Sequence, residues 1–145
     1  MSKTRSILVT AALPYANGLA HMGHLVEYIQ ADIWVRFQKL IGNRCVFVCA
    51  SDAHGTPIMI RARQDDVDPE EIVRHYHDRY IEDFAGFHIE FDNFYTTHST
   101  ENRELVEHIY EALKAGDHLA TRTIRQSYDE AEGMFLPDRF VRGTC

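Results

Sequence analysis

The chain has 145 residues and a formal net charge of −7, from 22 acidic and 15 basic side chains. This length is sufficient for one domain with a hydrophobic core. The acidic balance, without a long basic stretch, excludes a nucleic-acid footprint on the basis of composition. No run approaches the roughly 18 apolar residues that a membrane span needs, which excludes a membrane protein of that kind.

The first predicted elements are a strand and a helix. A short apolar run at residues 7–9 predicts a buried strand, which Pro14 and the pair Asn17-Gly18 then interrupt. Apolar side chains at helical spacing predict a helix that begins near Gly23: Leu25, Ile29, Ile33, Phe37 and Leu40 or Ile41. Because the first N–H groups of a helix lack intrahelical partners and the helix dipole makes that end positive, we expect an anion site there.

Two histidines, His21 and His24, flank the predicted start of this helix. Their imidazoles can donate hydrogen bonds to phosphate oxygens, and Gly23 between them lets a flat base or a sugar approach the backbone. No Ser, Cys or Lys stands nearby as an obvious nucleophile, so we expect positioning and charge stabilisation. An isolated pair of this spacing is a weak signal in a chain with nine histidines. Its place between a strand and a helix is what favours a site.

A second polar cluster, residues 52–57, follows another strand-like run at residues 46–48. Parallel strands present their carboxyl ends at one edge of a sheet, so this cluster is expected beside the first. The sequence therefore predicts one pocket built from two strand ends.

The remaining elements are predicted to be scaffold. Asp68 and Pro69 predict a capped helix start, followed by an apolar core stripe: Ile72, Tyr76, Tyr80, Phe84 and Phe87. Residues 92–97 predict a strand, and Ser99 is expected to cap a helix that ends before Gly116. That helix is expected to turn four residues inward: Leu105, Val106, Ile109 and Leu113. From residue 121 polar side chains alternate with apolar ones, and this pattern predicts strands of an inserted subdomain.

The cysteines and the N-terminus bear on the compartment. Cys45 and Cys49 lie on one face of a predicted strand, about 13 Å apart at roughly 3.3 Å per residue, which is beyond disulfide reach. We expect them to be core thiols in a reducing environment. Lys3 and Arg5 precede an apolar run, but polar Thr10 argues against a secretory signal. A cytoplasmic protein is expected.

Residues 13–24, Leu-Pro-Tyr-Ala-Asn-Gly-Leu-Ala-His-Met-Gly-His, resemble the HIGH signature of the class I aminoacyl-tRNA synthetases. Further segments resemble the bacterial methionyl-tRNA synthetase family: residues 51–57, 83–87, 92–95 and 134–145. The resemblance extends from about residue 7 to the last residue. One departure is Met22, where the family has isoleucine or leucine, and this apolar change conserves volume.

The resemblance implies roles for the matching positions. The catalytic residues it implies are His21 and His24. The ATP-binding residues are Asn17, His21, Gly23 and His24. The methionine-binding residues are Ala12, Leu13, Tyr15 and Asp52, where Asp52 would pair with the α-ammonium group. The only implied metal ligand is Cys145, as the first zinc ligand of the intact protein.

The resemblance also implies an α/β fold: the first half of a Rossmann-like nucleotide-binding parallel sheet with flanking helices. Residues 1–116 would form this half of the catalytic domain, and residues 117–145 would begin a connective insertion that reaches the zinc knuckle at Cys145. Implied ligands are ATP with Mg²⁺, methionine and tRNA(Met). One thiolate cannot build a four-coordinate Zn²⁺ site, so no zinc is expected in this chain alone. The second half of the fold and the KMSKS loop are expected beyond residue 145, so the chain alone is expected to be inactive.

Two other functions fit parts of the sequence. A nucleotidyl transferase of the same superfamily, similar to pantetheine-phosphate adenylyltransferase, also uses a His-Gly-His turn, but no basic phosphopantetheine site follows here. A metal hydrolase could use four side chains: His21, His24, Asp52 and His54. The sequence lacks the glutamate that the HExxH pattern of such enzymes would supply.

Overall fold

The computed structural model describes residues 4–131 and 133–136. The chain divides into two compact units, residues 1–99 and 100–145, and each is described by itself. The first unit contains, in chain order, β1 (Ser6–Thr10), α1 (Met22–Leu40), β2 (Arg44–Ser51), α2 (Thr56–Asp65), α3 (Pro69–Gly86) and β3 (Asn93–Thr96).

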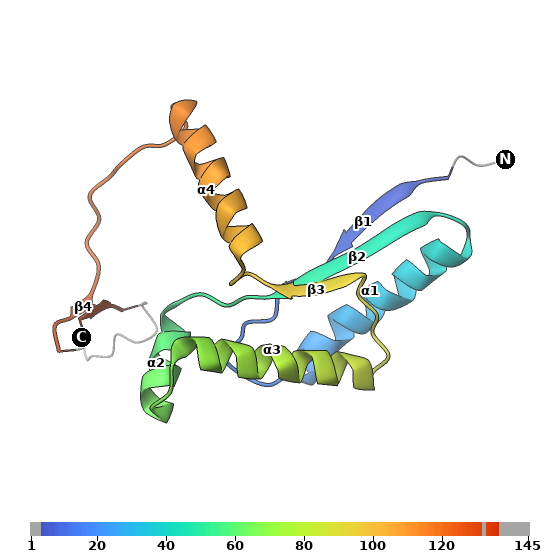
Figure 1. Ribbon diagram of the computed structural model, residues 1–145, viewed down its shortest axis with the longest axis horizontal. Helices are drawn as coiled ribbons and strands as arrows, with labels where there is room; N and C mark the ends of the chain where they lie inside the picture. The colour runs from blue at the N-terminus through green and yellow to red at the C-terminus, as the bar shows by residue number, and fades with distance from the viewer. Residues whose placement is uncertain (1–3, 132, 137–145) are drawn as a thin grey trace, which may run out of the picture. The chain divides into compact units, whose positions relative to one another are not determined.

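The three strands of the first unit form a parallel sheet in the order β1-β2-β3. Leu8 pairs with Val46, and Cys49 pairs with Phe94. Helices α1 and α3 connect successive parallel strands, and Figure 1 shows both below the sheet. Two consecutive right-handed crossovers in one direction place both helices on the same face. The predicted α/β architecture with a parallel sheet and flanking helices is confirmed.

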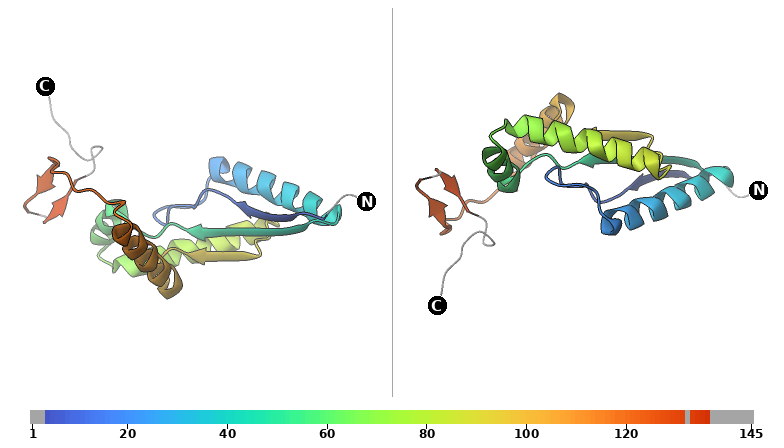
Figure 2. Two further views of the ribbon diagram at one scale, coloured as in Figure 1. Left: turned by 90° about the horizontal axis from the view of Figure 1, so that it is seen from above. Right: turned by 90° about the horizontal axis from the view of Figure 1, so that it is seen from below.

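One face of β2 forms the centre of the core. Its side chains alternate between buried and partly exposed positions, and the buried ones are Cys45, Phe47, Cys49 and Ser51. From the helices, the ring of Tyr28 on α1 lies 4.8 Å from that of Phe84 on α3, in an edge-to-face arrangement. Both cysteines are free thiols, as expected. Figure 2 shows the sheet and its helices from above and below.

The predicted helix starts are confirmed. Helix α1 begins at Met22, one residue before the expected Gly23, and α3 begins at Pro69 with Asp68 as its N-cap. The carboxylate of Asp68 accepts a hydrogen bond from the N–H of Glu70 at 2.7 Å. The predicted core stripe of α3 is buried except for Phe87, which lies at the C-cap and is 49% exposed. The prediction was wrong for this residue, which follows the last residue of the helix, Gly86.

The second unit contains α4 (Thr100–Ala115) and a two-stranded antiparallel pair, β4 (Tyr128–Asp129) with β5 (Met134–Phe135). Helix α4 begins directly after Ser99 and ends before Gly116, as predicted. One other expectation was wrong. Within this unit none of the residues of α4 is buried, and the four residues expected to turn inward are 42–56% exposed. The strands expected from residue 121 are confirmed in part: they begin only at Tyr128, as β4 and β5, and residues 121–127 form no strand.

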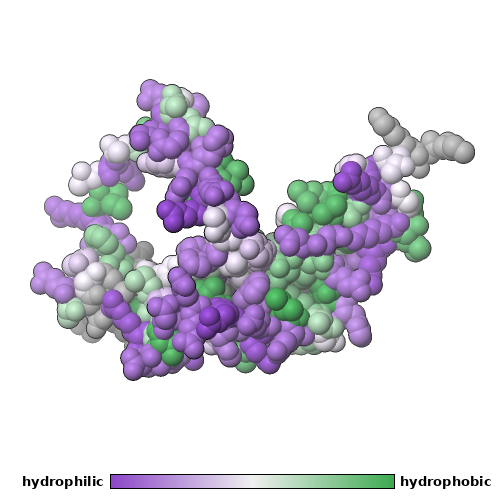
Figure 3. All heavy atoms as spheres, viewed as in Figure 1, coloured by the Kyte–Doolittle hydropathy of each residue, from purple (hydrophilic) through white to green (hydrophobic). Residues whose placement is uncertain are grey.

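Apolar side chains also remain exposed on the first unit. A shallow hollow of about 290 Å³ at the start of β1 and β2 is lined by Ser6, Ile7, Leu8, Arg44 and Val46. Figure 3 shows apolar residues over this part of the strands. No helix of the described part of the chain is both long and apolar enough to cross a membrane.

Candidate active site

Backbone hydrogen bonds join the loop after β1 to the end of β2. The N–H of Ala16 donates to the carbonyl of Asp52 at 2.8 Å, and the N–H of Asp52 donates to the carbonyl of Pro14 at 2.8 Å. These bonds form a parallel bridge between Tyr15 and Asp52. The loop after β1, which leads to the two histidines, is therefore in direct contact with the first residue of the second polar cluster.

His21 and His24 lie at the start of α1, with their rings stacked. Their centroids are 3.7 Å apart, and the ring planes differ by 15°. His21 is the N-cap, and its Nδ1 accepts a hydrogen bond from the N–H of Gly23 at 3.1 Å. Nδ1 of His24 accepts a long bond, 3.5 Å, from the N–H of His21. Because both Nδ1 atoms accept, a neutral ring carries its proton on Nε2, which is then the donor available to a ligand.

The charge state of His24 follows from its surroundings. Burial lowers the pKa of His24, the neighbouring His21 lowers it further, and the Glu27 carboxylate raises it. A neutral imidazole at pH 7 still donates a hydrogen bond through Nε2. Of the N–H groups at the start of the helix, that of Gly23 is already bonded to the N-cap side chain of His21.

Two glycines are fixed by close contacts with site side chains. A Cβ on Gly23 would lie 3.0 Å from Cε1 of His21, so a side chain there would push on the ring. A Cβ on Gly55 would lie only 2.7 Å from the hydroxyl of Tyr15, and its φ of 128° already favours glycine. Gly55 therefore permits the observed position of Tyr15.

The segment that follows β2 is held by the end of β3. The N–H of Thr97 donates to the carbonyl of Ser51 at 3.0 Å, and the N–H of Ala53 donates to the Thr97 hydroxyl at 2.9 Å. Asp52 between them is half-buried. Within the described residues its carboxylate accepts no hydrogen bond, so it is available to a cationic group.

Helix α1 holds the first residues of the loop. The N–H of Ala12 donates to the carboxylate of Glu27 at 2.7 Å, and the carbonyl of Ala12 accepts from the hydroxyl of Tyr28 at 2.6 Å. Leu13, the next residue, is 45% exposed. Asn17 is half-buried, and its N–H donates to the carbonyl of Tyr15 at 2.7 Å.

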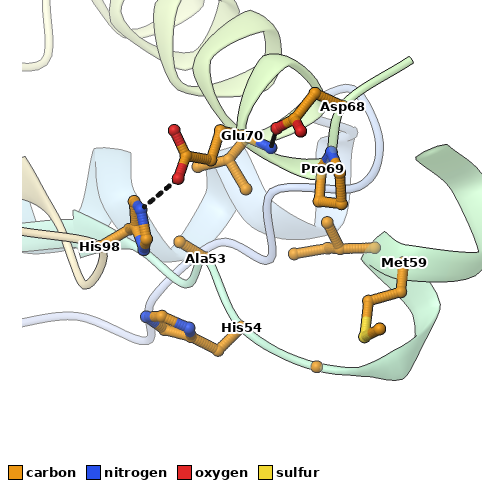
Figure 4. Close-up of a pocket in the computed structure, with 10 residues that line it drawn as sticks. Ala53, His54, Met59, Asp68, Pro69, Glu70 and His98 are labelled. Atoms are coloured by element: carbon orange, nitrogen blue, oxygen red, sulfur yellow. Dashed lines mark hydrogen bonds and ion pairs between the residues drawn. The ribbon is translucent and has the colours of Figure 1, made fainter. Parts of the chain in front are cut away.

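A cavity of about 390 Å³ lies beside this site, between the start of α2, the start of α3 and the end of β3. Figure 4 shows His54 and His98 on one side of it, with Glu70 near His98. Nε2 of His98 lies 3.5 Å from a carboxylate oxygen of Glu70. None of the described residues that the sequence assigns to ATP or methionine lines this cavity.

The described residues contain no group of three or more His, Cys, Asp or Glu side chains placed to hold a metal ion. His21, His24, Asp52 and His54 therefore do not form the cluster that a metal hydrolase would use. Cys145, the predicted zinc ligand, lies outside the described residues.

Comparison with known proteins decides between the remaining possibilities. The family model described as class I (M) tRNA synthetases matches residues 7–145. The chain belongs to this synthetase family. Methionine--tRNA ligases of two Acidithiobacillus ferrooxidans strains are each 57% identical to the chain over 141 residues. The match covers 97% of the chain, which spans 21% of the length of these curated relatives.

Two solved structures of Mycobacterium tuberculosis methionyl-tRNA synthetase with methionyl-adenylate share the fold of this synthetase chain. Their TM-scores are 0.81 and 0.79, at 23% sequence identity. In both comparisons 94% of the chain is covered, against 27% of the solved chain. The likeness to these two structures is one of fold.

Sequence patterns missed the side chains that hold the loop of this synthetase chain. Glu27 and Tyr28 bond to Ala12, and the hydroxyl of Tyr80 lies 2.8 Å from the carbonyl of Tyr15 and 2.7 Å from that of Gly18. The tyrosines stand at apolar positions of their helices, where periodicity indicates only burial. A buried tyrosine usually needs a partner for its hydroxyl, and this was the available signal.

Proposed function

We propose that this chain forms one side of the site in which a methionine--tRNA ligase activates methionine with ATP. The observation that carries the proposal is the bridge between Tyr15 and Asp52, which joins the loop that leads from β1 to the His21–His24 turn to the segment after β2. Family membership supports this reading. The activity, substrates and partners proposed below are those of a whole ligase.

His21, His24, Asn17 and Gly23 are proposed to bind ATP. The Nε2 donors of the stacked imidazoles suit phosphate oxygens, whose charge rises as the methionine carboxylate attacks the α-phosphorus and pyrophosphate leaves. Neutral rings can give these bonds at pH 7, and the lowered pKa of His24 fits that requirement. His21 and His24 are the proposed catalytic residues, acting by charge stabilisation.

Ala12, Leu13, Tyr15 and Asp52 are proposed to bind methionine. The half-buried Asp52 carboxylate, with no hydrogen-bond partner in the described part of the chain, suits the α-ammonium group. The exposed apolar side chain of Leu13 suits the thioether, which is apolar and polarizable.

In the whole ligase, methionine and ATP would give methionyl adenylate and pyrophosphate, and the methionyl group would pass to the 3′ end of tRNA(Met). Mg²⁺ is proposed to accompany ATP, and Cys145 to be the first ligand of a structural Zn²⁺ site. Residues 1–116 are proposed as half of the catalytic domain and residues 117–145 as the start of its insertion. The buried free thiols Cys45 and Cys49 fit a cytoplasmic protein.

The test is methionine-dependent exchange between ATP and pyrophosphate. This chain would replace the matching segment of the full-length Acidithiobacillus ferrooxidans ligase, and the chimera would be compared with its variants. We expect His21→Ala and His24→Ala each to lower kcat by about 100-fold or more, as removal of one transition-state donor does elsewhere. Asp52→Ala is expected mainly to raise the KM for methionine. The matched control is His75→Ala, an exposed histidine on α3.

Exchange that survives both histidine substitutions unchanged would refute the proposed role of the turn. Equal losses in the His75→Ala control would show that the assay reports folding instead. The chain by itself is expected to give negligible exchange.

A further inference from the structure

The loop from Pro14 to Gly18 depends on side chains from elsewhere in the fold for part of its bonding. It carries Tyr15 and Asn17, and its own backbone contributes the Ala16 N–H bond to Asp52 and the short bond from Asn17 to Tyr15. The carbonyls of Tyr15 and Gly18, three residues apart, both point to one hydroxyl. That hydroxyl belongs to Tyr80, at 2.8 Å and 2.7 Å.

Tyr80 comes from the middle of α3, more than 60 residues along the chain from the loop. Its side chain is 1% exposed. Burial raises the pKa of Tyr80 to about 12, so the hydroxyl keeps its proton at all physiological pH values. With a single proton, it donates to one carbonyl at a time or is shared between the two. It therefore ties both ends of the Tyr15–Gly18 turn to α3.

We propose that Tyr80 is a positioning residue for amino-acid activation, whose hydroxyl fixes the loop that presents Asn17 to ATP and Tyr15 to methionine. This inference rests on the proposed function. The ring and the hydroxyl have separate tasks. The ring packs in the core, stacked 6.1 Å from Phe84, whereas both acceptors of the hydroxyl lie in the loop.

Tyr80→Phe separates these tasks because it keeps the ring and removes one oxygen. The carbonyl of Tyr15 would still accept from the N–H of Asn17, while that of Gly18 would lose the hydroxyl that donates to it. The turn would then sample other positions, and misplacement of about 1 Å at a site can cost on the order of 100-fold in rate. Both substrates should be affected, since both proposed ligand residues lie on this turn.

Tyr76→Phe is the matched control. Tyr76 lies one turn earlier on α3, is 8% exposed, and makes no hydrogen bond to the loop in the described residues. Each variant removes one tyrosine hydroxyl from α3. Both are made in the chimera with the Acidithiobacillus ferrooxidans ligase. Exchange kinetics give kcat and KM separately for methionine and ATP, and thermal melting monitors the fold.

We expect Tyr80→Phe to raise both KM values about tenfold. Its melting temperature should lie below that of Tyr76→Phe, because a buried hydrogen bond is lost, but its unfolding should stay cooperative and lie above the assay temperature. Unchanged KM values, or a loss that Tyr76→Phe shares, would overturn the inference. So would a rise for only one substrate, because the turn carries both. Absence of exchange in the unsubstituted chimera would refute the proposed function instead, and the two failures are therefore distinguishable.

Discussion

The buried carboxylate of Asp32 offers a quantitative test of how the first unit is held together. Asp32 lies in the middle of α1 and is 6% exposed. One of its oxygens accepts from the N–H of Glu90 at 3.0 Å, and the other accepts from Nε of Arg36 at 2.6 Å. The guanidinium also donates to the carbonyl of His88 at 2.6 Å. This network joins α1 to the turn that leads from α3 to β3.

The cost of Asp32→Ala can be estimated from these contacts. An N–H left without its acceptor costs about 1–3 kcal/mol, and an ion pair to a half-exposed guanidinium adds at most about 1 kcal/mol. We expect the free energy of unfolding to fall by about 2 kcal/mol. With a urea m-value of about 2 kcal/mol per M, the unfolding midpoint should fall by about 1 M. Asp32→Asn keeps an acceptor for Glu90 and should lose about half as much.

The assay is urea unfolding of this chain, followed by far-UV circular dichroism. The matched control is Asp65→Ala, which breaks an exposed pair with Arg61 at the same i,i+4 spacing and should leave the midpoint unchanged. A shift for Asp32→Ala no larger than that of the control would refute the reasoning. An equal loss for Asp32→Asn would show that the charge, and not the hydrogen bond to Glu90, matters.

Three further outcomes follow from the contacts described. Gly55→Ala in the chimera should raise the KM for methionine in exchange kinetics, since the new Cβ collides with the Tyr15 hydroxyl; an unchanged KM would place Tyr15 outside the methionine site. Burial lowers the pKa of His77, whose Nδ1 lies 2.9 Å from the hydroxyl of buried Ser51. Its stabilising contribution is therefore complete above pH 6.5 and is lost as the pH falls through the lowered pKa, so His77→Gln should flatten the decline in urea midpoint between pH 7 and pH 5. Phe47→Ala empties a fully buried position and should cost about 3–5 kcal/mol, seen as a lost or strongly shifted urea transition; a shift under 0.5 M would contradict this.

Local patterns were sufficient for most of the first unit. The strand at residues 7–9, the break at Pro14 and the helix from residue 22 follow from apolar periodicity and from residues that interrupt it. The parallel arrangement also followed, because strands separated by helices pair in parallel. The same reasoning was right only in part from residue 121 on: residues 121–127 form no strand, and the strand begins at Tyr128, where β5 supplies a partner.

The sequence by itself therefore determined the order of elements, the shared sheet edge at which the loop after β1 meets Asp52, and the family. The tertiary structure alone decided what holds the site: the Tyr80 hydroxyl on the loop, the Asp32 network, and the contact between Gly55 and Tyr15. The physical reason is the distance along the sequence over which each kind of interaction acts. Periodicity and capping depend on neighbours within a few residues, whereas these contacts join residues 40 to 65 positions apart whose proximity depends on how the crossovers pack.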